Sequence, residues 1–187
     1  AFRGGTALNK LFLEPQLRFS EDIDLVQVKS KPIKETIERL RIQLGFLDLH
    51  QVRLKLNNNT VVFKYDSESN PGSKLKLKIE INCREHFSVL GFIKKEYKIQ
   101  SDWFNGNCYL KTYLPEELLG TKLRALYQRT KGRDLFDLFK AITSMKLDTD
   151  NILMCYREYM KFSVTTPPTR IQFIQNIEKK LTDDEFI

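Results

Sequence analysis

Two aspartates separated by one apolar residue are the pair in this sequence best suited to chemistry. Asp22 and Asp24 flank Ile23 within residues 19–28, a run that favours a β-strand. Alternate side chains of a strand project from the same face, so both carboxylates face one way and Ile23 faces the core. Two acids on one face repel each other unless a cation joins them, and hard divalent cations take such oxygen ligands. The pair therefore predicts a Mg²⁺ or Mn²⁺ site suited to phosphoryl or nucleotidyl transfer. The alternative is a pair of solvated or salt-bridged acids.

A glycine pair precedes these acids and opens a short apolar helix. Gly4 and Gly5 stand before residues 6–13, and the hydroxyl of Thr6 is expected to cap that helix. Free N–H groups at a helix start bind anions, and glycines let a phosphate approach closely. A nucleoside triphosphate bound there would lie beside the acid pair. The alternative is a tight turn before a short core helix. Ser20, two residues before Asp22 on the same face, is a further candidate for nucleotide binding.

A third carboxylate lies in a strictly alternating run, residues 74–82. Its apolar side chains share one face, whereas Glu80 shares the other with lysines and Asn82. If this strand neighbours that of the aspartates, Glu80 completes a group of three metal-binding acids or acts as base on an attacking hydroxyl. The alternative is one acid on an exposed, lysine-rich face.

Basic residues follow on a helix predicted from Pro115 to Thr130. Lys122 lies in its apolar stripe, four residues after Leu118, and Arg129 lies one heptad beyond Lys122. A buried lysine without a partner is costly, so a phosphate or a carboxylate must meet it. The alternative is that the ammonium reaches the surface from the edge of the stripe.

A second helix, predicted from Arg133 to Met145, carries two acids near its start. We expect Asp137 to pair with Arg133 as a structural clamp, and Asp134 to hold Lys122 or Arg129.

The order of the elements predicts an α+β protein. A mixed, twisted sheet with helices on one face is expected in residues 1–113, and a helical lobe in residues 114–187. Further helices are predicted at 33–44, 150–162 and 170–181, and further strands at 49–56 and 60–65. Residues 92–99 are expected to form an edge strand or an exposed loop.

Composition narrows the class of protein. The formal net charge of +7 favours polyanionic partners. No apolar run is long enough to span a bilayer, and no secretory signal pattern is seen, so no membrane partner is expected. Cys83, Cys108 and Cys155 are odd in number and widely spaced, which favours reduced thiols and a cytoplasmic location.

Five motifs, taken in this order, resemble the AbiEii/AbiGii-type nucleotidyltransferases, toxins of abortive-infection toxin–antitoxin systems within the polymerase-β-like nucleotidyltransferase superfamily. The motifs are Phe2–Leu8, Arg18–Leu25, Lys78–Asn82, Thr121–Arg129 and Arg133–Leu138.

The resemblance implies roles for single residues. Asp22 and Asp24 would hold the metal, Gly4, Gly5 and Thr6 would line the phosphates, and Lys122 would contact the triphosphate. Asp134 would belong to the last motif, and Glu80 stands where many members carry a third Asp.

The resemblance also implies a reaction. A nucleotide would pass from an NTP to an acceptor hydroxyl, with an RNA such as tRNA as acceptor and an antitoxin protein as partner. Two alternatives stay open: a non-catalytic nucleotide- or RNA-binding module on this fold, and a nucleotidyltransferase that modifies a small molecule such as an antibiotic.

Overall fold

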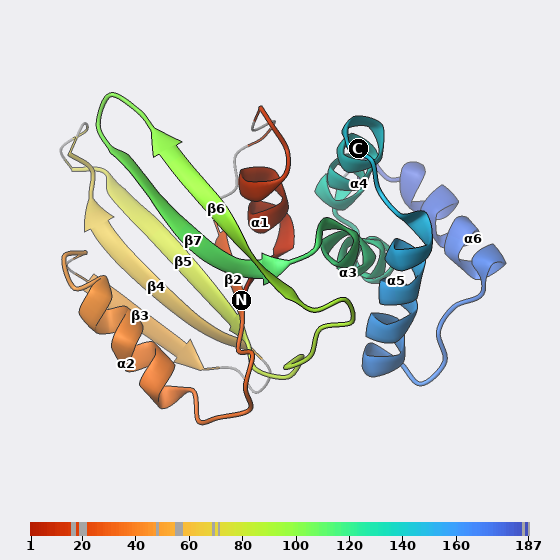
Figure 1. Ribbon diagram of the computed structural model, residues 1–187, viewed down its shortest axis with the longest axis horizontal. Helices are drawn as coiled ribbons and strands as arrows, with labels where there is room; N and C mark the ends of the chain where they lie inside the picture. Colours follow the sequence, from red (N-terminus) through yellow and green to blue (C-terminus); the bar gives the residue numbers. More distant parts are fainter. Residues whose placement is uncertain are drawn as a thin grey trace.

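A computed structural model describes residues 1–15, 18, 22–47, 49–54, 58–68, 70, 72–184 and 186. The predicted α+β class is confirmed: the described strands form one mixed sheet in the order β3-β4-β5-β2-β1-β7-β6 (Figure 1). The strands are β1 (Phe2–Arg3), β2 (Asp22–Val26), β3 (Leu49–Leu54), β4 (Asn58–Asp66), β5 (Lys74–Asn82), β6 (Phe92–Gln100) and β7 (Asn105–Tyr113). The helices are α1 (Gly4–Leu11), α2 (Lys34–Gln43), α3 (Pro115–Gln128), α4 (Gly132–Ser144), α5 (Thr149–Ser163) and α6 (Arg170–Leu181).

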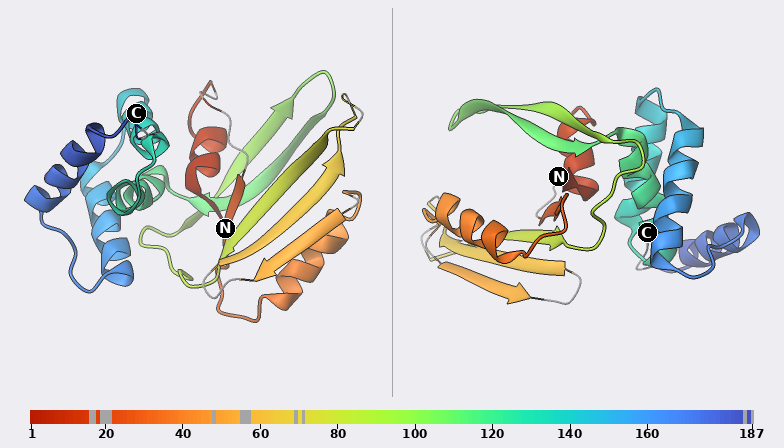
Figure 2. Two further views of the ribbon diagram at one scale, coloured as in Figure 1. Left: turned by 180° about the vertical axis from the view of Figure 1, so that it is seen from behind. Right: turned by 60° about the horizontal axis from the view of Figure 1, so that its bottom comes forward.

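The sheet bends around two of its helices. Strands β6 and β7 lie on one side of α1 and α2, and β3, β4 and β5 lie on the other (Figure 2, right). Ile37 of α2 packs against Phe63, Ile79 and Ile81, so the apolar face of β4 and β5 points toward this helix. The opposite, polar face of these strands therefore points outward.

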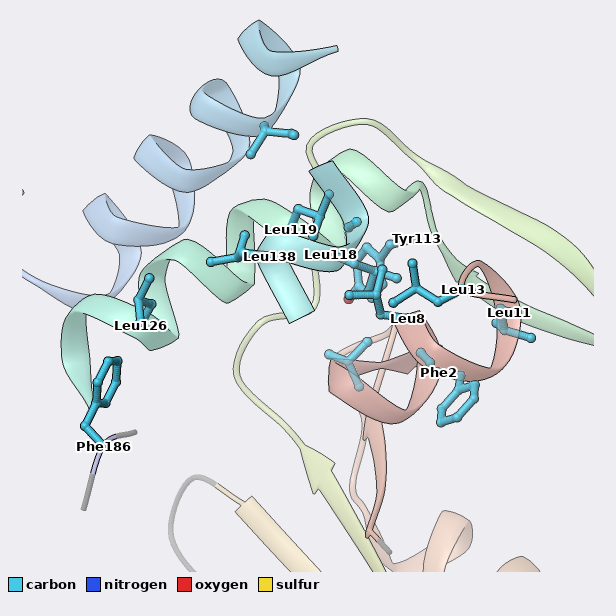
Figure 3. Close-up of a cluster of buried hydrophobic side chains, with 14 residues drawn as sticks. Phe2, Leu8, Leu11, Leu13, Tyr113, Leu118, Leu119, Leu126, Leu138 and Phe186 are labelled. Atoms are coloured by element: carbon cyan, nitrogen blue, oxygen red, sulfur yellow. The ribbon is translucent and has the colours of Figure 1, made fainter. Parts of the chain in front are cut away.

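A second core cluster joins the sheet to the later helices. Leu8 of α1, Leu118 and Leu119 of α3, and Leu138 of α4 are buried together in it (Figure 3). Burial of such side chains contributes roughly 1.5–3 kcal/mol each. This shared core fixes α3 and α4 relative to the start of α1.

Two buried glutamates tie loops to helices. Glu117 of α3 accepts hydrogen bonds from Ser88 Oγ, the backbone N–H groups of Val89 and Leu90, and Tyr159 Oη. Burying a carboxylate is costly unless it is fully paired, and these donors meet that need.

Glu85 is shared by two arginines, Arg3 and Arg124, each at 2.5 Å. Burial opposes its ionisation, but the two arginines outweigh burial and hold the pKa of Glu85 below its usual value.

Two strands were not predicted, and one local prediction is wrong. Strand β7 was not predicted, because it begins with Asn105, Gly106 and Asn107, residue types that rarely form strands. Strand β1 was also not predicted, because it is only two residues long. Thr6 does not cap α1: the helix begins at Gly4, and Thr6 Oγ1 donates instead to the carbonyl oxygen of Asp22 at 2.6 Å.

In the part of the chain that the structure describes, no helix is long and apolar enough to cross a membrane.

Candidate functional site

The three predicted acids lie on one face of two adjacent strands. Strands β2 and β5 pair in parallel, with Asp22 opposite Lys78 and Asp24 opposite Glu80. Residues opposite each other in a sheet point to the same face. The strand of Glu80 is therefore the neighbour of the strand of the aspartates, which is the condition under which Glu80 was predicted to join them. Burial raises the pKa of Asp24, and the nearby charges of Glu80 and Asp22 raise it further. These carboxylates therefore repel one another on a shared surface.

The glycine turn lies directly against the acids. Gly4 has a φ of +74°, a left-handed conformation that side chains other than hydrogen rarely adopt. A Cβ at Gly4 would overlap Oδ2 of Asp24 and lie 3.0 Å from its Cβ and Cγ. Glycine is therefore required at this position both by the backbone conformation and by the close approach of Asp24.

A lysine lies between two of the acids. Lys78 Nζ is 2.6 Å from Glu80 Oε1 and 3.2 Å from Asp22 Oδ2. The hydrogen bond to Glu80 is the main cause of the raised pKa of Lys78. Its positive charge balances part of the negative charge of the acids, on the face where a metal cation was predicted to bind.

The acids fit a divalent cation in donor type and in charge. Among the described residues, no three His, Cys, Asp or Glu side chains are grouped closely enough to hold a metal ion together. Asp22, Asp24 and Glu80 nevertheless supply oxygen ligands on one face, and Lys78 already acts there as a stand-in cation. In this arrangement the Lys78 ammonium, rather than a metal ion, pairs with Asp22 and Glu80.

Lys122 is buried, as its place in the apolar stripe of α3 predicted, and its partners are carboxylates. Its Nζ lies 2.7 Å from Asp134 Oδ1 and 2.9 Å from Asp137 Oδ2. Asp134 also accepts two hydrogen bonds from Arg129, at 2.7 and 2.9 Å. The prediction that Asp134 holds Lys122 or Arg129 is confirmed for both residues.

The predicted Arg133–Asp137 pair is wrong. Asp137 accepts instead from Arg18 Nε at 2.8 Å and Arg18 Nη2 at 2.7 Å, from Lys122, and from Asn9 Nδ2 at 3.1 Å. Burial opposes ionisation of Asp137, but these donors outweigh it and hold its pKa below the usual value. Asp137 thus joins the loop before β2 to α1, α3 and α4.

The acids and the basic side chains line one hollow of about 440 Å³. Its basic residues are Arg18, Lys78, Lys122, Arg129 and Arg133, and its other lining residues are Gly5, Thr6, Asp22, Asp24 and Glu80. This mixture suits a polyphosphate bound beside a cation, because the basic groups face the phosphates and the acids face the metal.

A second hollow of about 280 Å³ adjoins the first. The two share Gly5, Asp24, Glu80, Lys122 and Arg129, and the second is further lined by Arg3, Gly4, Leu25, Asn82, Thr121, Arg124, Ala125 and Gln128. A ligand of nucleotide size can therefore extend from one hollow into the other past Asp24.

Three basic residues of the first hollow were not predicted from the sequence, and one predicted residue has no described position. Arg18, Lys78 and Arg133 line the first hollow and were not predicted as site residues. Alternation along β5 places Lys78 on the face of Glu80 and was a usable signal. Ser20 lies outside the described residues.

Comparisons with known proteins agree with this site. The family described as nucleotidyl transferase AbiEii toxin of type IV toxin–antitoxin systems matches residues 1–186. A comparison with curated protein sequences gives no match.

Solved structures that share the fold include MenT4, a nucleotidyltransferase toxin from Mycobacterium tuberculosis H37Rv. The TM-score is 0.64 at 19% identity, over 92% of this chain and 61% of that chain. An antigenic nucleotidyltransferase-like protein from Paracoccidioides brasiliensis has a TM-score of 0.54 at 16% identity, over 95% of this chain and 83% of that chain. The family match covers nearly the whole sequence, and this chain therefore belongs to the AbiEii family of nucleotidyl transferase toxins.

Proposed function

We propose that this chain transfers a nucleoside monophosphate from an NTP to an acceptor hydroxyl, with RNA, such as tRNA, as the acceptor and Mg²⁺ or Mn²⁺ as cofactor. The observation that carries the proposal is the 440 Å³ hollow, where two strands and a glycine turn bring three acids against basic side chains. Membership in a family of toxins from toxin–antitoxin systems supports an antitoxin protein as partner. A cytoplasmic location is part of the proposal.

The proposed binding mode follows from the lining of the two hollows. The triphosphate lies against Gly5, Thr6, Arg18, Arg129 and Arg133, and the sugar and base extend past Asp24 into the adjoining hollow. Lys122 lines both hollows and contributes positive charge beside Gly5, where a Cβ would come 3.1 Å from its Nζ. Asp134 and Asp137 position this ammonium rather than contact the nucleotide.

The proposed reaction is an in-line displacement at the α-phosphorus. The acceptor oxygen forms a bond to phosphorus, the bond to the β-phosphate oxygen breaks, and pyrophosphate leaves. Glu80 accepts the hydroxyl proton, and Arg18, Arg129 and Arg133 stabilise the charge on the leaving pyrophosphate. A divalent metal bound at Asp22 and Asp24 would supply charge stabilisation at the reacting phosphate.

The proposal is tested with each α-labelled NTP, Mg²⁺ and total RNA, followed by measurement of pyrophosphate release and of label in RNA. Asp22→Asn and Asp24→Asn should each abolish both signals while the thermal midpoint stays near that of the wild type. Asp66→Asn is the matched control, because Asp66 is an exposed aspartate on β4 that pairs with Lys74. Full activity in either site variant would refute the role of the acids. Pyrophosphate release without labelled RNA would refute RNA as the acceptor.

A further inference from the structure

Strands β4 and β5 place lysines opposite one another on the outward face of the sheet. Lys64 of β4 is the register partner of Lys76 of β5, and both side chains are exposed. Lys74 and Lys78 lie two residues to either side of Lys76, at a spacing of about 6.7 Å along the strand. We call Lys64, Lys74, Lys76 and Lys78 the outer lysine face.

Two of these lysines carry charge that the described protein does not neutralise. Lys74 Nζ lies 2.6 Å from Asp66, and Lys78 pairs with Glu80 and Asp22. Neither Lys64 nor Lys76 has an ion-pair partner among the described side chains. Like charges directly opposite each other across two strands are destabilising, so this arrangement is costly to the isolated protein.

This face is open to solvent. Helix α2 packs on the other side of β4 and β5, where Ile37 contacts Phe63, Ile79 and Ile81. Seen from behind, no helix lies over the outward side of these strands (Figure 2, left). An extended ligand can therefore lie along β5 without displacing any helix.

The outer lysine face leads directly into the acid group. Lys78 is both the last lysine of the row and the register partner of Asp22, and Glu80 follows it on the same face. An acceptor must present its hydroxyl at these acids. The rest of the acceptor molecule must then lie along a neighbouring surface of the protein. The row of lysines is such a surface, and its charge is complementary to a phosphate backbone.

We propose that the outer lysine face binds the phosphate backbone of a single-stranded RNA segment and leads its terminal hydroxyl to Asp22, Asp24 and Glu80. This inference rests on the proposed function, and it assigns the path of the acceptor. A single row of charges along a strand follows one phosphate chain, as positively charged grooves do in proteins that bind single strands. The nucleotide lies on the other side of the acids, against Arg18, Arg129 and Arg133.

The test compares two pairs of lysines with the same cross-strand geometry. Lys64→Gln/Lys76→Gln removes the unpaired charges of the outer lysine face. Lys94→Gln/Lys111→Gln is the matched control, because Lys94 and Lys111 are exposed register partners on β6 and β7, in the other layer of the bent sheet. All four side chains are exposed, so both variants should fold, which circular dichroism and the thermal midpoint will verify.

The probe is a fluorescein-labelled single-stranded RNA of mixed sequence with a free 3′ hydroxyl, titrated by anisotropy between 50 and 200 mM NaCl. Removing two phosphate contacts should reduce the slope of log affinity against log salt by about 1.4, so the loss of affinity relative to the wild type should be about sevenfold larger at 50 mM than at 200 mM NaCl. The control variant should keep the affinity and slope of the wild type. Binding of labelled NTP, measured separately, should be unchanged in both variants.

Equal affinities and slopes for the two double variants would overturn the inference. It would also be overturned if the wild-type protein bound an acidic protein but not the labelled RNA. Pyrophosphate release in the same samples separates this failure from that of the proposed function. If the wild type releases pyrophosphate and labels RNA while the lysine substitutions have no effect, only the path is wrong. If the wild type turns over no NTP with any RNA, the proposed function is wrong.

Discussion

Comparing Gly4→Ala with Gly91→Ala separates two effects: the strain of a side chain in a left-handed backbone conformation, and its contact with Asp24. Gly4 and Gly91 have similar left-handed φ angles, +74° and +87°. A Cβ at Gly4 would overlap Asp24 Oδ2, whereas a Cβ at Gly91 would have no described atom within 4 Å beyond Gly91 itself and its two chain neighbours. The two glycines therefore form a matched pair that differs in the contact with Asp24.

The structure sets the size of each effect. Alanine in a left-handed conformation costs roughly 1–2 kcal/mol, so both variants should lose about this much free energy of unfolding. Ordinary van der Waals contacts begin near 3.4 Å, so Gly4→Ala must move the Asp24 carboxylate by about 1 Å. A displacement of about 1 Å at a reacting centre can lower the rate about 100-fold.

Urea unfolding and pyrophosphate release measure the two effects on the same protein samples. We expect both variants to lose similar stability, and Gly4→Ala alone to lose turnover. A Gly4→Ala protein with more than half of the wild-type rate would show that Asp24 tolerates displacement. Equal loss of rate in Gly91→Ala would show that backbone strain, rather than contact with Asp24, limits activity.

Two further predictions concern charged groups of the site. Lys78→Met should tighten Mn²⁺ binding by about tenfold or more, because an ammonium near Asp22 and Glu80 repels a metal cation. Calorimetry without nucleotide measures this affinity, and Lys76→Met is the control. Unchanged Mn²⁺ affinity in Lys78→Met would show that the ammonium does not compete with the metal. Asp137→Asn should lower the free energy of unfolding by about 3 kcal/mol at pH 7, because it leaves buried Lys122 and Arg18 short of a partner. The pKa of Asp137 is lower in the folded protein than its usual value, so the stability it contributes is present above about pH 4 and is lost as the pH falls through the folded-state pKa. Urea unfolding at pH 7 and pH 3 should therefore show the difference between variant and wild type narrowing in acid, and a constant difference would contradict this.

Features that depend on local patterns could be predicted from the sequence. Alternation along residues 74–82 placed Glu80 and its lysines on one face, and helical spacing placed Lys122 in a buried stripe. Both follow from the geometry of single elements, which the order of residues determines directly.

Contacts between distant segments could not be predicted. Arg18 and Asp137 are 119 residues apart, and their pairing depends on how α4 packs beside the start of α1. Arg133, only four residues from Asp137, was therefore the more obvious partner, although its side chain lines the hollow instead. Sequence spacing describes neighbours along one helix, whereas tertiary packing decides which charges are buried together.

The shared hydrophobic core limits how this site can admit its substrates. One wall of the hollow comes from β2 and β5, the other from α3 and α4, and Leu8, Leu118 and Leu119 are buried where these parts meet. Separating the two walls would expose these side chains to water, at a cost of roughly 1.5–3 kcal/mol for each side chain. Entry of the proposed nucleotide without separating these walls leaves only movement of exposed side chains such as Arg133, so we expect the rate of entry to depend on side-chain rotation rather than on separation of the walls.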